Sequence, residues 1–107
     1  MTLEVFMQFV ITAYDGTDED VLARRMSVRP LHLANLEKVK ETGSVVCAGG
    51  IIRDGHPVGS VLVMEFESRE KLDEYLANEP YVINNVWQDI TVENMNVVIV
   101  NDEMVGK

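Results

Sequence analysis

The sequence predicts a single α+β domain with the element order β-α-β-β-α-β, the ferredoxin-like arrangement with an antiparallel sheet. Three observations lead to this prediction. Four stretches with alternating or continuous apolar residues are typical of strands, and two longer stretches repeat their apolar residues at the helical period. Asp-Gly pairs and single glycines separate these stretches. Within residues 1–107 we expect a core at about 5–100 and a mobile tail at 101–107.

The first strand is expected at residues 5–14. One phase of this stretch is wholly apolar and the other is partly apolar, which is typical of a central strand covered on both faces. Residues 15–16 form the turn that follows. Either Thr17 or Asp18 is expected to cap a long helix, and this helix is expected to end before Gly43.

The long helix has an apolar face formed by Leu22, Met26, Leu33 and Leu36, and we expect this face to be buried. Pro30 falls inside the helix, where it lacks an N–H and clashes with the preceding turn. Either the helix kinks at Pro30 or a second helix begins there. The residues after Pro30 keep the same phase in both cases.

The second half of the chain supplies the remaining elements. Two strands are expected at 44–52 and 59–66, joined by a turn. Ser68 is expected to cap a short second helix, which ends at 78–80 because the residue before a proline is pushed out of helical geometry. The last strand is expected within 89–100.

This element order has a consequence for assembly. Right-handed crossovers place both helices on one face of the sheet. The strands carry apolar residues on both phases, so the other face would be a larger apolar patch than monomers usually expose. Packing two such sheets face to face covers it, and we therefore expect a homodimer with two-fold symmetry.

Composition excludes several partners. The formal net charge of −9 argues against nucleic acid and against anionic membranes, because both bind basic surfaces. No apolar run is long enough to span a membrane, and residues 1–4 do not resemble a secretory signal. A single cysteine fits the reducing cytoplasm, where we expect the protein to reside.

The remaining metal-ligating and aromatic residues give weaker indications. Two histidines and one cysteine, far apart in sequence, make a poor metal set, so no metal site is predicted. Cys47 follows two valines in a predicted strand and is expected to be an inert core thiol. Trp87 precedes the last strand as either a pocket wall or a dimer contact.

The candidate site lies on the long helix. Arg25, Arg29 and His32 recur at i, i+4 and i+7 and therefore lie along one edge of the helix. His32 has two interpretations: a partly buried histidine bonded to a backbone carbonyl, or a general acid/base, because histidine alone titrates near neutral pH. The arginines form a local basic spot that can receive a small anion on an otherwise acidic chain.

Several motifs together resemble the YciI (YCII-related) family over roughly residues 6–98. The resemblance implies a dimeric α+β barrel and a pocket between helices and sheet that holds a histidine with an acidic partner. It also implies chemistry on ring compounds, such as dehydrochlorination of a chlorinated hydroxyquinol, in a superfamily that includes muconolactone isomerases and cofactor-free monooxygenases. The motifs are Ser27 to Leu33, Gly43, Gly49-Gly50, Asp54-Gly55, Gly59-Ser60, 66–68 and 79–82.

The resemblance also assigns roles to single residues. His32 matches the family histidine, and Arg29 matches the arginine before the proline. The family motif Asp-Pro-Phe/Tyr stands here as Glu79-Pro80-Tyr81, with a carboxylate one methylene longer. Glu79 or Asp54 would be the acidic partner of His32, and Tyr81 would line the pocket.

Two functions follow as hypotheses. In the first, His32 with Glu79 or Asp54 moves a proton on a small cyclic or anionic metabolite, in an isomerisation, lactone reaction or HX elimination that needs neither metal nor organic cofactor. Arg29 or Arg25 would neutralise the anionic substrate. In the second, the protein is a non-catalytic dimer that binds a small molecule or a partner protein.

Overall fold

The computed structural model describes residues 6–106 and confirms the ferredoxin-like element order. Val5, at the start of the predicted first strand, lies outside the described residues, as does Lys107 in the predicted tail. The elements in chain order are β1 (Met7–Asp15), α1 (Val21–Glu41), β2 (Val45–Arg53), β3 (His56–Phe66), α2 (Arg69–Asn78), α3 (Pro80–Ile83), β4 (Trp87–Met95), β5 (Ile99–Val100) and β6 (Glu103–Met104).

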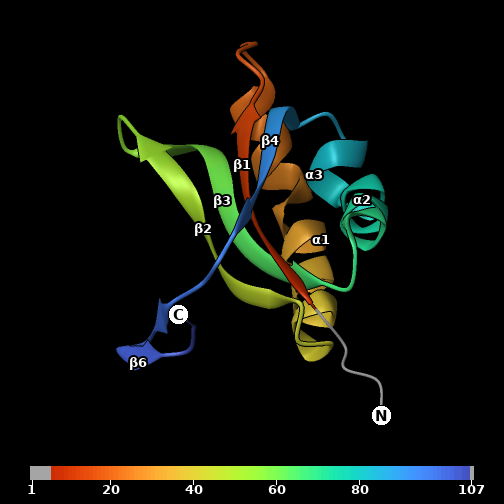
Figure 1. Cartoon of the computed structure of the whole chain (residues 1–107). Helices are drawn as coiled ribbons and strands as arrows, with labels where there is room; N and C mark the ends of the chain where they lie inside the picture. Colours follow the sequence, from red (N-terminus) through yellow and green to blue (C-terminus); the bar gives the residue numbers. More distant parts are fainter. Residues whose placement is uncertain (1–5, 107) are drawn as a thin grey trace.

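Strands β1 to β4 form an antiparallel sheet in the order β2-β3-β1-β4, and the helices cover one face of it (Figure 1). As predicted, β1 is a central strand. Gly59 on β3 allows the close approach of β1, because a Cβ there would lie 2.5 Å from the carbonyl oxygen of Ala13. Strand β2 is an edge strand, and its Cys47 is exposed. The prediction of a core thiol is therefore wrong, since an edge strand has a neighbour on one side only.

The hydrophobic core lies between the sheet and the helices. Alternate residues of β1 and β3 point into it, including Phe9, Ile11, Leu62 and Met64, all at 1% exposure or less. Burial of each such side chain stabilises the fold by about 1.5–3 kcal/mol. Ser68 caps α2 as predicted, since its hydroxyl accepts from the backbone N–H of Lys71 at 3.2 Å.

Helix α1 differs from the prediction at its start and at its middle. It begins at Val21, and the residue at its N-cap is Asp20, whose side chain makes no capping bond, so the prediction of Thr17 or Asp18 is wrong. Asp18 instead accepts two bonds from Arg24 at 3.0 Å. The helix runs through Pro30 as one element and no second helix begins there.

The buried face of α1 also differs. Leu22, Met26 and Leu33 are 38%, 53% and 43% exposed, so their expected burial is wrong, whereas Leu36 of the same face is half-buried and packs against the core. The buried residues of α1 are Arg25, Val28 and His32, at i, i+3 and i+7. A stripe with two ionisable side chains is buried here because both of them find acidic partners in the core.

The C-terminal segment has more secondary structure than was predicted. Strand β4 ends at Met95, and β5 and β6 pair as a short hairpin apart from the main sheet (Figure 1). Asn101 and Asp102, at the turn, both have positive φ, which suits a tight hairpin turn. No helix within residues 6–106 is long and apolar enough to cross a membrane.

Candidate active site

A cavity of about 510 Å³ lies between α1 and strands β2 and β3. Its strand wall includes Ala48, Gly49 and Gly50, and the small size of these residues leaves this space beneath the helix. The exposed apolar side chains Met26 and Leu33 belong to its helix wall. Met26, Leu33 and Leu36 of the predicted face therefore line a cavity, whereas Leu22 lies outside it, and Leu36 also packs against the core.

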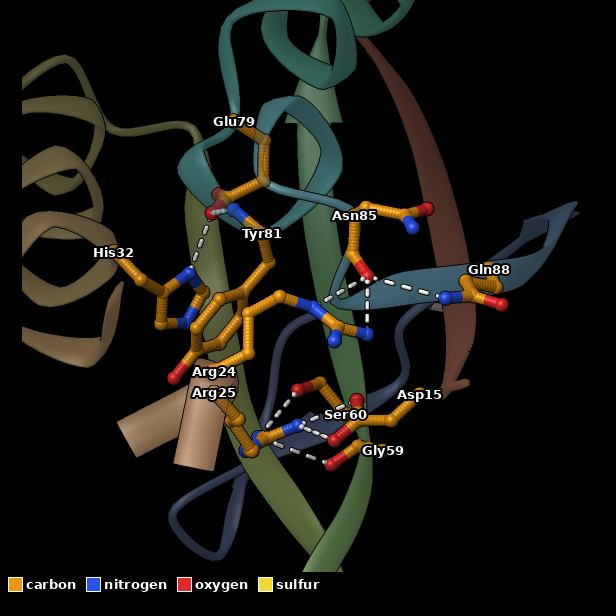
Figure 2. A network of polar contacts seen from close by, with 10 residues as sticks. All are labelled: Asp15, Arg24, Arg25, His32, Gly59, Ser60, Glu79, Tyr81, Asn85 and Gln88. Carbon is orange, nitrogen blue, oxygen red and sulfur yellow. Dashed lines mark hydrogen bonds and ion pairs between the residues drawn. The ribbon is translucent and has the colours of Figure 1, made fainter. Parts of the chain in front are cut away.

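His32 and Glu79 form a buried pair beside this cavity (Figure 2). His32 Nδ1 lies 2.6 Å from Glu79 Oε1, and the two residues are 7% and 0% exposed. A carboxylate only accepts, so the proton on neutral His32 belongs on Nδ1. Nε2 then carries the lone pair, and it has no hydrogen-bond partner within residues 6–106. His32 lines the cavity and can act there as a proton acceptor.

The carboxylate of Glu79 is held by three donors. Tyr75 Oη donates to Oε2 at 2.6 Å, and the backbone N–H of Tyr81 donates to Oε1 at 3.2 Å, beside the bond from His32. Glu79 occupies the N-cap of α3, directly after α2 ends, so the chain turns around this side chain. Burial and the neighbouring Glu79 charge raise the pKa of Tyr75 well above its usual value of 10.0, so its hydroxyl stays a donor.

Aromatic rings fix the plane of the imidazole. The ring of Tyr81 stacks on His32, with centroids 4.0 Å apart and an angle of 16° between the planes. Trp87 meets His32 edge-on at 5.6 Å. Trp87 is only 3% exposed, so it supports the site from within the core.

A second buried ion pair supports the same site (Figure 2). Arg25 Nη1 lies 2.7 Å from Asp15 Oδ1, and Arg25 Nη2 donates to Ser60 Oγ at 3.1 Å and to the carbonyl of Gly59 at 3.3 Å. The guanidinium carbon of Arg25 lies 4.8 Å from the ring centroid of Tyr81. Arg25 thus holds the ring that stacks on His32, and its charge is already balanced by Asp15.

The other candidate residues fall in two places. Arg29 lines the cavity, is exposed, and forms no ion pair within the described part of the chain, so its charge is available to a ligand. Asp54 lies at the exposed turn between β2 and β3 and does not line the cavity. The structure therefore pairs His32 with Glu79 and does not bring Asp54 to it. No cluster of three metal-ligating side chains occurs within residues 6–106.

Sequence reasoning missed two residues of the site. Tyr75 precedes Glu79 by four positions, a spacing that places the two side chains on the same side across the end of α2. That spacing is a signal in the sequence. The sequence pattern predicted Asp15 only as part of a turn. In the structure Asp15 is the last residue of β1, and its partner Arg25 lies ten residues further along the chain.

These observations define a ferredoxin-like α+β domain with a buried histidine–carboxylate pair beside a cavity. Residues 7–96 match the YCII-related domain, and the chain belongs to this family. Protein YciI of Escherichia coli O6:H1 is 34% identical over 94 residues, which cover 81% of this chain and 94% of YciI. An uncharacterized protein of Haemophilus influenzae is 31% identical over 94 residues, with the same coverage of both chains. The resemblance to the YciI family is thereby confirmed.

Two solved structures share the fold. One is the 5-chloro-2-hydroxyhydroquinone dehydrochlorinase (TftG) from Burkholderia phenoliruptrix, in complex with 2,5-dihydroxybenzoquinone. It is 26% identical, has a TM-score of 0.72, and the match covers 81% of this chain and 91% of that chain. The other is an antibiotic biosynthesis monooxygenase, at 22% identity and a TM-score of 0.53 over 87% of this chain and 99% of that chain, a likeness of fold alone.

Proposed function

We propose that the protein is a cofactor-independent enzyme that uses His32 as a general acid/base on a small anionic ring compound. The elimination of HX is the reaction that we favour. The observation that carries this proposal is the buried pair of His32 and Glu79. His32 also lines a cavity of about 510 Å³, and its Nε2 has no hydrogen-bond partner within residues 6–106. The similarity to TftG, a dehydrochlorinase, supports the choice of reaction.

The chemistry needs one proton acceptor and one positive charge. The halide leaves from the keto tautomer of such a ring, in which the carbon that carries the halide is tetrahedral. His32 Nε2 takes the proton of the enol hydroxyl group conjugated to that carbon, and Glu79 stabilises the imidazolium that forms. The electron pair of the broken O–H bond moves through the double bond and expels halide, so that a quinone forms, the proton resides on His32 and the halide leaves as an anion. Arg29 balances the negative charge that develops on the deprotonated oxygen. Isomerisation uses the same first step and returns the proton at another atom.

The test is chloride release from 5-chloro-2-hydroxyhydroquinone under anaerobic conditions, measured against heat-denatured protein. We expect catalysed, saturable release. A ligand titration with 2,5-dihydroxybenzoquinone, followed through the NMR signals of His32, shows whether the cavity binds such rings. Binding without chloride release would favour the non-catalytic alternative, a small-molecule-binding dimer. If neither binding nor release occurs, the assigned substrate class is wrong.

We also propose that the protein is a homodimer formed through the face of the sheet opposite the helices. Val10, Val61 and Val63 alternate with core residues and therefore point to that face, where Val61 is 36% exposed. We expect a mass in solution of about twice the 12.0 kDa of one chain, measured by light scattering. Val61→Lys should produce monomers, whereas Ile83→Lys, at a 63% exposed residue of α3, should not. A wild-type mass of one chain would contradict this assembly.

A further inference from the structure

We propose that Tyr75 is a positioning residue of this site, which sets the state of His32 by holding Glu79. The inference rests on the proposed use of His32 in proton transfer. Tyr75 Oη donates to Glu79 Oε2 at 2.6 Å, and Glu79 Oε1 accepts from His32 Nδ1 at the same distance. The carboxylate therefore joins the hydroxyl and the imidazole through its two different oxygens.

Among the described residues, Tyr75 is the sole donor to one of these oxygens. The bonds from His32 Nδ1 and from the backbone N–H of Tyr81 both go to Oε1, so Oε2 has Tyr75 as its one partner within residues 6–106. Glu79 is 0% exposed, so the protein itself must satisfy that oxygen. A glutamate side chain has three rotatable bonds, and a carboxylate anchored at one oxygen alone can turn about the last of them.

Loss of that anchor would act on the imidazole. A carboxylate that turns, or that takes up a proton to satisfy Oε2, no longer offers His32 a fixed acceptor at Nδ1. The neutral imidazole then distributes its proton between Nδ1 and Nε2. Proton transfer at Nε2 requires this atom to be unprotonated, so a mixed tautomer leaves only part of the molecules competent.

The ring of Tyr75 has a separate function, which lets its hydroxyl be tested alone. The ring is 7% exposed, belongs to the core, and lies 6.0 Å from the ring of Phe66. Phenylalanine at this position keeps these contacts. Tyr75 does not line the cavity beside His32, so it acts on the imidazole through Glu79 without touching a ligand bound there.

The test is the tautomer of His32, read from the 15N chemical shifts of its ring nitrogens at a pH where the ring is neutral. We expect wild-type protein to hold the Nδ1–H tautomer and Tyr75→Phe to give a mixture. Tyr14→Phe, which removes a hydroxyl on the other face of the sheet, is the matched control and should leave the tautomer unchanged. An unchanged tautomer in Tyr75→Phe would overturn the proposal.

A double-mutant cycle shows whether Tyr75 acts through Glu79. In Glu79→Gln protein, the additional change Tyr75→Phe should leave the His32 shifts where they are, because the carboxylate that couples the two is gone. The same shift in both backgrounds would show that Tyr75 acts by another route.

A second variant covers the case in which Tyr75→Phe does not fold. 3-Fluorotyrosine at position 75 keeps the ring and the hydroxyl, and it should still move the His32 signals. No movement of these signals would refute the coupling.

These readouts separate this inference from the proposed reaction. The tautomer responds to Tyr75 whether or not the protein releases chloride. If wild-type protein does release it, Tyr75→Phe should lower kcat by up to about 100-fold, the size expected for a misplaced catalytic group, with little change in KM. A changed tautomer in a protein without turnover would leave the coupling valid and remove the proposed reaction.

Discussion

Replacing His32 with Gln is expected to lower the rate of chloride release by about 10²- to 10⁴-fold, the usual contribution of a general acid/base. Glutamine can donate a hydrogen bond to Glu79 as the imidazole does, but it cannot take up a proton at neutral pH. The variant should stay folded because Tyr75 and the backbone N–H of Tyr81 continue to satisfy the Glu79 carboxylate. Kinetics measured beside a circular dichroism spectrum separate lost chemistry from lost structure.

His56→Gln is the matched control for this variant. His56 is the other histidine of the chain, and it is exposed at the start of β3, outside the cavity beside His32. We expect the rate of the His56 variant to equal that of the wild type. Full activity in His32→Gln would exclude His32 as the proton acceptor, and equal losses in both variants would show that the substitution acts on something other than the site.

The element order could be predicted from the sequence because strand and helix periodicity are local properties. The wholly apolar phase of β1 and the Ser68 cap of α2 are both readable within a few residues, and both are present in the structure. The hairpin of β5 and β6 was not predicted. It is built from two strands of two residues each, too short for a periodic pattern to form.

The buried face of α1 was mispredicted for a physical reason. Hydrophobic periodicity treats charged residues as exposed, and it therefore selects Leu22, Met26 and Leu33 over Arg25 and His32. The fold reverses this choice because Asp15 and Glu79 pair with the two buried side chains. Periodicity cannot show that a buried partner exists, since the partner comes from a distant part of the chain.

Choosing the acidic partner of His32 also required the structure. Glu79 lies 47 residues away from His32, and Asp54 lies nearer in sequence. The turn between β2 and β3 carries Asp54 to the exposed end of the hairpin, whereas the end of α2 carries Glu79 to the imidazole. Family resemblance narrowed the choice to two residues, and only the packing of α1 against α3 decides between them.

Replacing Arg25 with Met is expected to lower the free energy of unfolding by about 3–5 kcal/mol, because it leaves the charge of Asp15 buried without a partner. The side chains of Arg25 and Asp15 are 6% and 3% exposed. Native domains are stable by only about 5–15 kcal/mol, so this loss is a large share of the total. Met keeps the aliphatic part of the side chain, so the effect reports on the lost guanidinium group. Urea unfolding at pH 7 measures it.

Arg24→Met is the control, since it removes the neighbouring guanidinium from a solvent-exposed pair with Asp18. We expect a much smaller loss there, because water already screens that pair. Similar losses in the two variants would contradict the distinction between a buried and an exposed pair. Arg24 and Arg25 are the same residue type at neighbouring positions, so the sequence alone does not show which of them is buried. The comparison of the two variants therefore tests the burial that the fold gives to Arg25.

The stability deficit of Arg25→Met should also depend on pH. Burial raises the pKa of Asp15 above its ordinary value of 3.8, and Arg25 opposes that rise by its hydrogen bonds and its charge. Without Arg25 the carboxyl of the folded protein holds its proton to a higher pH than the unfolded chain does. The folded state then binds more protons above pH 3.8, and its stability falls as the pH increases. Urea unfolding should therefore show the smallest loss of unfolding free energy in Arg25→Met at acidic pH and the largest near neutrality. A loss that does not depend on pH would mean that lost packing, and not the unpaired Asp15 charge, is the cause.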